Sequence, residues 1–188
     1  MSSKIKYLFI ILIFIVISCA PKDESKENDP NWINVDDISV HFSPNNNLEI
    51  VLVKLLQSAK ESIDMAIYDL TNQFISDALI KAHNNGIAVR VYCDKNINPD
   101  YEQPLIDEMR AAGITVYIAN TKNWTNVESF KAIMHNKFII VDQETILTGS
   151  YNFSKNAENN NRENFIIIKN PLIALKYQEA FDGYWLNP

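Results

Sequence analysis

Two short stretches carry the decisive pattern of this chain: His135-Asn136-Lys137-Phe138-Ile139-Ile140-Val141-Asp142 and Gly149-Ser150-Tyr151-Asn152. Residues two apart on a strand share a face, so we predict that a strand over 135–141 points His135 and Lys137 the same way. The same spacing relates Ser150 to Asn152. A turn at 142–144 and a second strand over 145–148 would form a hairpin, which brings the two pairs side by side.

The side chains of these stretches are suited to binding and attacking a phosphate. Lys137 supplies a fixed positive charge, and Ser150 and Asn152 supply neutral hydrogen-bond donors. His135 can attack phosphorus or transfer a proton near neutral pH. Gly149 allows a close backbone approach just before Ser150. Each residue alone is more often structural or solvated, but the ordered combination H-x-K-x4-D-x6-G-S-x-N is far more specific.

The flanking sequence alternates short strands with amphipathic helices, which indicates an α/β fold with a sheet that contains parallel strands. The apolar spacing predicts strands over 38–42, 63–67, 87–93, 114–118 and 164–168. It predicts helices over 48–59, 74–82, 105–112 and 172–185, with Gly86 and Gly113 as helix ends.

The first residues are typical of an export signal, which defines an expected signal peptide over 1–18. Lys4 and Lys6 precede an apolar run over 7–17 that is short for a membrane span. The run ends in Val16-Ile17-Ser18-Cys19, which resembles a bacterial lipobox and implies cleavage before Cys19 and lipidation of its sulfur. An uncleaved anchor with an incidental cysteine is the alternative.

Residues 19–37 would then form the lipidated cysteine and a polar tether, and 38–188 the folded domain. The expected location is the cell envelope, with the protein lipid-anchored outside the cytoplasm, on the periplasmic face or at the outer membrane. The chain's only other cysteine is Cys93, so no intrachain disulfide is expected. The formal charge of −6 means that any attraction to a polyanion must come from a local patch.

The ordered combination resembles the HKD motif of the phospholipase D superfamily, and the resemblance covers roughly residues 39–185. Phe42-Ser43-Pro44, the helix after it and the strand ending in Ile67-Tyr68 are similar to that family's opening elements. Arg162-Glu163-Asn164 resembles its downstream acidic element. The resemblance implies a mixed β-sheet flanked by helices on both faces, with a single HKD domain.

The resemblance also implies a phosphodiesterase that needs no metal or other cofactor and works through a phosphohistidine. His135 would be the nucleophile in one copy and the acid/base in another. Lys137 and Asn152 would hold phosphate oxygens with support from Ser150, and Glu163 would orient His135. Asp142 is one step off the His135/Lys137 alternation, so we expect it to be structural and to pair with a cation, with Gly149 also structural.

A single HKD copy predicts a homodimer with one active site shared across the twofold axis. Nucleic acid is the first expected substrate, with stacking and phosphate contacts from Lys122, Trp124 and Lys131, and local charge from Lys155 and Arg162. The alternative is a phospholipase D that cleaves membrane phospholipids such as cardiolipin or phosphatidylcholine. A non-catalytic envelope lipoprotein that uses the fold for binding is the third possibility.

Overall fold

The computed structural model describes residues 37–44, 46–120 and 132–186. They belong to one compact unit, Ile33–Pro188. Its strands are β1 (Ile38–Phe42), β2 (Ser62–Ile67), β3 (Ala88–Cys93), β4 (Thr115–Ile118), β5 (Lys137–Val141), β6 (Thr145–Gly149) and β7 (Asn164–Lys169). Its helices are α2 (Leu48–Gln57), α3 (Gln73–Asn84), α4 (Gln103–Ala111), α5 (Lys155–Asn159) and α6 (Pro171–Leu186). None of these helices is long and apolar enough to cross a bilayer.

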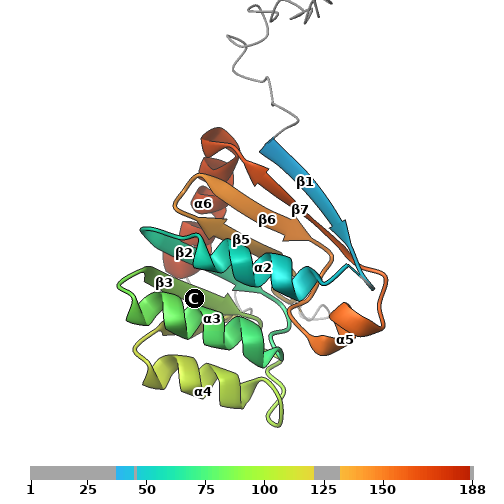
Figure 1. Ribbon diagram of the computed structural model, residues 1–188. Coiled ribbons are helices and arrows are strands. Elements are labelled where there is room, and N and C mark those ends of the chain that lie inside the picture. Colours follow the sequence, from blue (N-terminus) through green and yellow to red (C-terminus); the bar gives the residue numbers. More distant parts are fainter. Residues whose placement is uncertain (1–36, 45, 121–131, 187–188) are drawn as a thin grey trace, which may run out of the picture. The chain divides into compact units, whose positions relative to one another are not determined.

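The described strands form one mixed sheet in the order β1-β7-β6-β5-β2-β3-β4 (Figure 1). β2 pairs in parallel with β3, and β3 with β4. On its other side β2 pairs antiparallel with β5, and the remaining pairs are antiparallel as well. The predicted hairpin is therefore confirmed as β5–β6, which lies next to the parallel half of the sheet.

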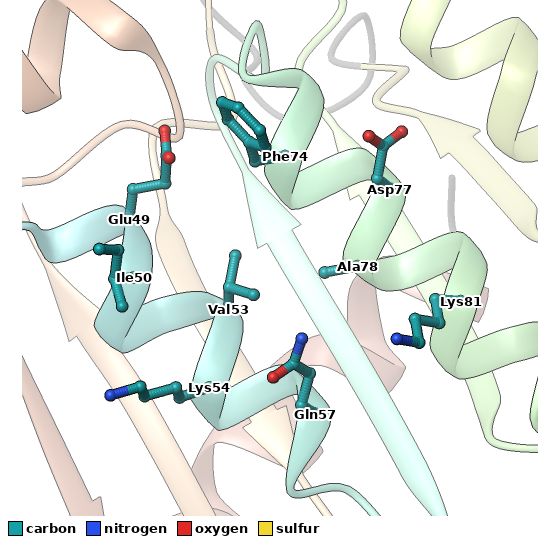
Figure 2. A pocket seen from close by; sticks show the side chains of 9 residues that line it. All are labelled: Glu49, Ile50, Val53, Lys54, Gln57, Phe74, Asp77, Ala78 and Lys81. Atoms are coloured by element: carbon teal, nitrogen blue, oxygen red, sulfur yellow. The ribbon is translucent and has the colours of Figure 1, made fainter.

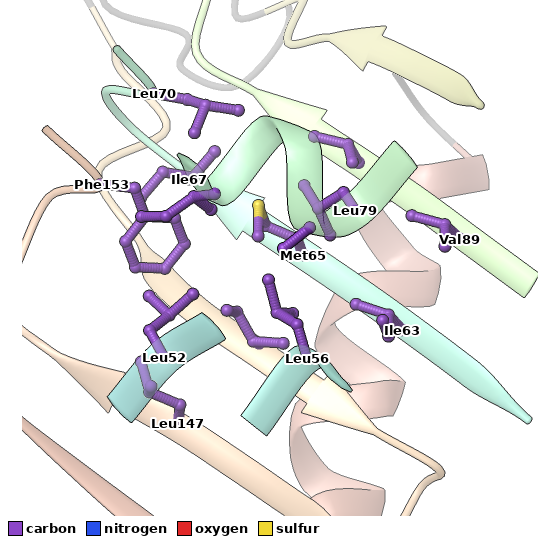
Figure 3. Packing of buried hydrophobic residues seen from close by; sticks show 14 of the residues in the cluster. Leu52, Leu56, Ile63, Met65, Ile67, Leu70, Leu79, Val89, Leu147 and Phe153 are labelled. Atoms are coloured by element: carbon purple, nitrogen blue, oxygen red, sulfur yellow. The ribbon is translucent and has the colours of Figure 1, made fainter. Parts of the chain in front are cut away.

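Helices cover both faces of this sheet, as predicted (Figure 1). One apolar cluster joins α2, α3 and α4 to the face that carries Met65 and Ile139; Figure 3 shows its centre, with Leu52 and Leu79 over Met65. The other cluster joins α6 to Ala66 and Phe138 on the opposite face. Because successive strand residues alternate between the faces, both sides of β2 and β5 are buried. All strands and both clusters lie within Ile33–Pro188, so this unit contains the complete core.

The chain segments that matter for function meet at one end of the sheet, where several strands end or begin. The register pairs Ile67 at the end of β2 with Lys137 at the start of β5, and Gly149 at the end of β6 with Phe165. β1 and β3 also end there, because β1 runs antiparallel to β7 and β3 runs parallel to β2. We call this end of the sheet the polar edge, although it is not an edge strand. It consists of the ends of β1, β2, β3, β4 and β6, the starts of β5 and β7, and the loops that join them.

Candidate active site

His135 lies at the polar edge, but just outside the strand that was expected to hold it. β5 begins at Lys137, and the structure has no strand geometry over 132–136. The physical reason is that β2 ends at Ile67, the partner of Lys137, and offers no further residue for pairing. The prediction of a strand beginning at His135 is therefore wrong by two residues.

Side chains from two other elements hold the segment before β5 in place of a strand neighbour. The carboxylate of Asp94, directly after β3, accepts a hydrogen bond from the backbone N–H of Met134 at 2.6 Å. The hydroxyl of Tyr184, near the end of α6, accepts one from the Asn136 side-chain amide at 3.0 Å. These two contacts flank His135 on either side along the chain.

His135 and Lys137 meet around a third side chain, Tyr68. The Lys137 ammonium donates a 2.8 Å hydrogen bond to the backbone carbonyl of His135 and lies 4.9 Å from the centre of the Tyr68 ring. The His135 imidazole contacts the same ring edge-on, at 4.6 Å between ring centres. His135 is exposed, whereas Lys137 is 6% exposed. The imidazole therefore faces solvent above a buried cation.

The charge of Lys137 has no close partner within the part of the chain that the structure describes. Burial lowers the pKa of Lys137, while the nearby carboxylates of Glu163 and Asp69 raise it. Neither of these two carboxylates comes within the 4.0 Å of an ion pair. A buried ammonium without a contacting carboxylate is a favourable place for an anionic ligand.

Asn152 and Ser150, which were expected to converge on one phosphate, differ in their environment within the described structure. The Asn152 side-chain oxygen is buried and has no hydrogen-bond partner among the described residues. The Ser150 hydroxyl accepts the backbone N–H of Asn164 at 3.1 Å, and the Ser150 N–H donates to the Asn164 carbonyl at 2.9 Å. Asn152 thus retains an unused polar atom, while Ser150 ties the end of β6 to β7.

Glu163 is near the site, but its carboxylate does not orient His135 by a hydrogen bond in the described structure. It accepts the side-chain amide of Asn161 at 3.0 Å. The backbone of Glu163 pairs with Ser43 in both directions, which fixes the start of β7 against the end of β1. What Glu163 contributes at the site is negative charge close to Lys137.

The close approach expected at Gly149 is made to the protein itself. A methyl group on Gly149 would lie 2.2 Å from the backbone oxygen of Asn164 and 2.7 Å from the Cα of Phe165. Glycine is required here because β6 and β7 come into direct contact, not because a phosphate approaches.

Asp142 has the structural role that was predicted, with different partners. Its carboxylate accepts the backbone N–H groups of Lys60, Glu61 and Ser62 at 2.8 to 3.1 Å. Burial alone would raise the pKa of Asp142, but these N–H groups hold it below its usual value. Asp142 thus joins the β5–β6 turn to the start of β2, at the end opposite the polar edge. Its contacts are to backbone donors, and the nearby charge of Lys60 also lowers its pKa.

Sequence reasoning missed Asp69 and Asp94 and gave no role to Tyr68. Burial raises the pKa of Asp69. A hydrogen bond with the Ser154 side chain and the charge of Lys137 oppose part of this rise. Asp94 is completely buried. All three residues follow or end the parallel strands β2 and β3. Polar side chains in that position are the signal that could have found them.

Several predicted contacts fall outside the described residues, namely Lys122, Trp124 and Lys131 in one loop and the lipidated Cys19. Of the residues expected to add local charge, Arg162 is exposed, and Lys155 is exposed with its ammonium 5.9 Å from the Phe74 ring centre. No three His, Cys, Asp or Glu side chains in the described ranges are grouped as metal ligands.

A groove of the described surface lies on the helix layer, and none of the candidate catalytic residues lines it. Figure 2 shows this groove of about 490 Å³ between α2 and α3. Ile50, Val53, Phe74 and Ala78 give it an apolar lining.

A family model described as cardiolipin synthase, PLD-like domain, matches residues 52–185. The chain is 34% identical to the mitochondrial cardiolipin hydrolase of Chlamydomonas reinhardtii over 69% of its own length and 54% of that protein. It is 31% identical to the phospholipase D of Rickettsia conorii over 80% of its length and 68% of that protein. The chain thus spans about half the length of the algal relative and about two thirds of the rickettsial one.

Solved structures show the same architecture. The phospholipase D family member Nuc from Salmonella typhimurium superposes with a TM-score of 0.70 at 31% identity, covering 79% of this chain and 93% of that one. NucT from Helicobacter pylori superposes with a TM-score of 0.67 at 24% identity, covering 79% and 96%.

Proposed function

Because the chain belongs to the phospholipase D superfamily, we propose that it is a phosphodiesterase whose nucleophile is the imidazole of His135. The observation that supports this most directly is the buried ammonium of Lys137, which lies beside His135 without a contacting carboxylate in the described structure. A fixed, desolvated cation stabilises the charge that develops on phosphate oxygens when a fifth ligand attacks.

The proposed reaction has two steps. A ring nitrogen of His135 forms a bond to phosphorus, and the bond to the leaving oxygen breaks. A second, protonated imidazole gives its proton to that oxygen, then takes a proton from the water that cleaves the phosphohistidine. The ammonium of Lys137 and the side-chain N–H groups of Asn152 would donate hydrogen bonds to the remaining phosphate oxygens.

The second imidazole is proposed to come from a second copy of this chain. Among the described residues His135 is the histidine that contacts Lys137, whereas His41 lies in β1 and packs on Phe165, and this supports a second imidazole from outside the chain. Two copies related by a twofold axis through the site would supply one His135 as nucleophile and the other as acid and base.

Nucleic acid remains the first candidate substrate. The match to Nuc supports this candidate, since it covers 93% of that protein at 31% identity. The loop that would supply stacking and phosphate contacts to a strand includes Trp124.

Phospholipid is the second candidate, and a feature of the polar edge favours it. Large apolar side chains are exposed around the site, among them Phe74 and Tyr101. For the location we propose a lipid anchor at Cys19 outside the cytoplasm, because the lipobox-like sequence precedes a domain whose substrate would be at or near a membrane.

The function is tested by incubating purified protein with single-stranded DNA, RNA, plasmid, and cardiolipin or phosphatidylcholine vesicles, with and without EDTA. We expect turnover of one class, unchanged by EDTA and abolished in His135→Ala. The matched control is His83→Ala, since His83 lies at the end of α3, away from the polar edge. Absence of turnover on all substrates, or activity that EDTA removes and a divalent ion restores, would contradict the proposal.

A further inference from the structure

The exposed apolar side chains of the described structure are concentrated at one end of the molecule. Nine large hydrophobic residues are exposed in the described ranges. Three of them, Val40, Leu172 and Leu175, lie away from the polar edge. The others lie at the polar edge and are here called the apolar rim: Phe42, Ile50, Phe74, Tyr101, Ile133 and Leu186. Phe74 is 57% and Tyr101 68% exposed, so solvent contacts most of each side chain.

The fold places the rim residues there from several separate elements. Ile50 and Phe74 lie in the first turns of α2 and α3, which start where β1 and β2 end; Figure 2 shows both at the same end of the groove. Tyr101 and Ile133 precede α4 and β5. The bond between Tyr184 and Asn136 brings the end of α6, with Leu186, to the same edge.

The charge of the polar edge differs from that of the chain as a whole. In its described loops the exposed charged residues are the basic Lys95, Lys155 and Arg162 and a single acid, Asp100. The loops at the opposite edge expose more acids than bases: Asp37, Glu61 and Glu144 against Lys60 and Lys169. The described connections of the polar edge are therefore more basic than a chain of formal charge −6 as a whole, although α3 and α4, which start at this edge, expose the acids Asp77, Asp107 and Glu108.

We propose that the apolar rim and its neighbouring cations form a membrane-binding surface that seats the polar edge on an anionic lipid bilayer. Apolar side chains enter the boundary between headgroups and acyl chains, while lysine and arginine pair with anionic headgroups. A bilayer explains how the rim residues are distributed. They come from the helix layers on both faces of the sheet, and a flat membrane lying across the strand ends would contact both layers at once.

This surface goes beyond the proposed function, because binding to a bilayer needs no turnover. It is compatible with the proposed dimer: a twofold axis along the strands would point both polar edges in one direction, so that both rims meet one bilayer. It would also make phospholipid, the second candidate substrate, accessible to the site, since it would bring His135 to the level of the headgroups.

The test uses the Ile33–Pro188 unit, which contains the complete core and no acylation site. Co-sedimentation is measured with phosphatidylcholine vesicles that contain phosphatidylglycerol, and with phosphatidylcholine alone. We expect Phe74→Ser/Tyr101→Ser to weaken binding to the mixed vesicles about tenfold or more. The matched control, Leu172→Ser/Leu175→Ser, removes equally exposed side chains from α6 near the opposite edge and is expected to bind as the wild type does.

A charge pair of variants tests the second component of the surface. Lys155→Glu/Arg162→Glu should weaken binding to the phosphatidylglycerol vesicles, and Lys60→Glu/Lys169→Glu should not. Equal losses in both pairs, or none, would overturn the proposal, and so would a rim variant that becomes monomeric by light scattering, since the rim would then be a subunit interface. Hydrolysis of a small soluble phosphodiester should be unchanged in the rim variant; a wild type that binds vesicles without hydrolysing any phosphodiester would contradict the proposed function alone.

Discussion

The carboxylate of Asp94 accepts the backbone N–H of Met134 at 2.6 Å and thereby connects the end of β3 to the residue that precedes His135. Both residues are buried, and Asp94 also accepts the backbone and side-chain N–H groups of Asn96. Since the described segment before β5 has no strand partner, this hydrogen bond to a buried carboxylate is one of the contacts that restrain its path, together with the Asn136–Tyr184 bond. Asp94 is thus a positioning residue for His135.

Replacing Asp94 by asparagine should lower kcat about tenfold and leave KM nearly unchanged. The side-chain amide of the new asparagine has one oxygen in place of two, so an N–H group faces a donor that the Asp94 carboxylate now accepts. The hydrogen bond from Met134 therefore weakens, while the side-chain volume stays the same. Steady-state kinetics on whichever substrate the turnover assay identifies, together with thermal unfolding, separates this effect from simple instability. Asp100→Asn, an exposed acid of the same loop, is the control, and equal kcat in both variants would argue against positioning.

Mixtures of wild type and His135→Ala should show that two chains share one site. If each site needs two imidazoles, subunit exchange at equal amounts leaves about a quarter of the wild-type activity, because only wild-type pairs turn over. Independent monomers would leave about half. Activity measured across the mixing series after mild denaturant exchange decides between a quadratic and a linear dependence.

Gly149→Ala should prevent normal folding. The added methyl group would lie 2.2 Å from the backbone oxygen of Asn164, and a backbone atom within a sheet cannot move aside cheaply. We expect a loss above roughly 3 kcal/mol in the free energy of unfolding and a poor soluble yield. Gly183→Ala meets nothing within 4 Å and should stabilise α6 slightly. A Gly149→Ala protein with wild-type thermal unfolding would refute the close contact between β6 and β7.

Asp142→Ala should cost about 1–3 kcal/mol, because three backbone N–H groups lose their acceptor. The pKa of Asp142 is lower in the folded than in the unfolded chain. Its stabilisation is therefore present above the unfolded pKa and is lost as the pH falls through the folded pKa. Urea unfolding should show a difference between variant and wild type that shrinks in acid. Asp142→Asn tolerates the positive φ of this turn and should lose less.

Glu102 should make stability fall with rising pH. Its carboxyl is 2% exposed, and burial raises its pKa to about 7, although the N–H groups of Leu70 and Asn98 partly oppose this. The folded protein therefore holds this proton more tightly than the unfolded chain, so the stability is full below about pH 4.5 and is lost as the pH rises through 7. The shift corresponds to about 3 kcal/mol.

The measurement is urea unfolding of wild type and Glu102→Gln on both sides of pH 7. The glutamine cannot ionise, so the wild type should lose stability relative to this variant as the pH rises. Glu144→Gln, at an exposed position of the β5–β6 turn, should track the wild type throughout. A constant difference between wild type and Glu102→Gln would mean that the buried carboxyl titrates as in the unfolded chain.

The strands and helices were largely predictable from the sequence, because the apolar spacing of a strand (every second residue) and that of a helix (every third or fourth residue) are local patterns. Ile63, Met65 and Ile67 alternate as a strand does, and the structure has β2 over those residues. The order β1-β7-β6-β5-β2-β3-β4 was not predictable, since nothing in residues 38–42 alone indicates that they pair with 164–168. Strand pairing between the two ends of a domain is decided by packing across the whole chain.

The site was predictable as a set of residues and less so as a set of contacts. The motif identified His135, Lys137 and Asn152, and the structure gathers them at one edge. It did not reveal that Ser150 binds Asn164, since this contact depends on how β6 and β7 meet, or that Glu163 binds Asn161. It gave no role to Tyr68 and Asp94, because they follow β2 and β3 and lie far from the motif in the sequence.

The pairing of β1 with β7 has a consequence for the order of folding. Ile38 lies opposite Ile168, so most of the folded domain separates two strands that are direct neighbours in the sheet. β2 and β3 can pair much earlier, because a short helical connection joins them. During synthesis the first strand of the domain must wait for the last, and Glu163 and Ser43 meet only then. A chain released before β7 should therefore retain the parallel half of the sheet but lack the polar edge around β6 and β7.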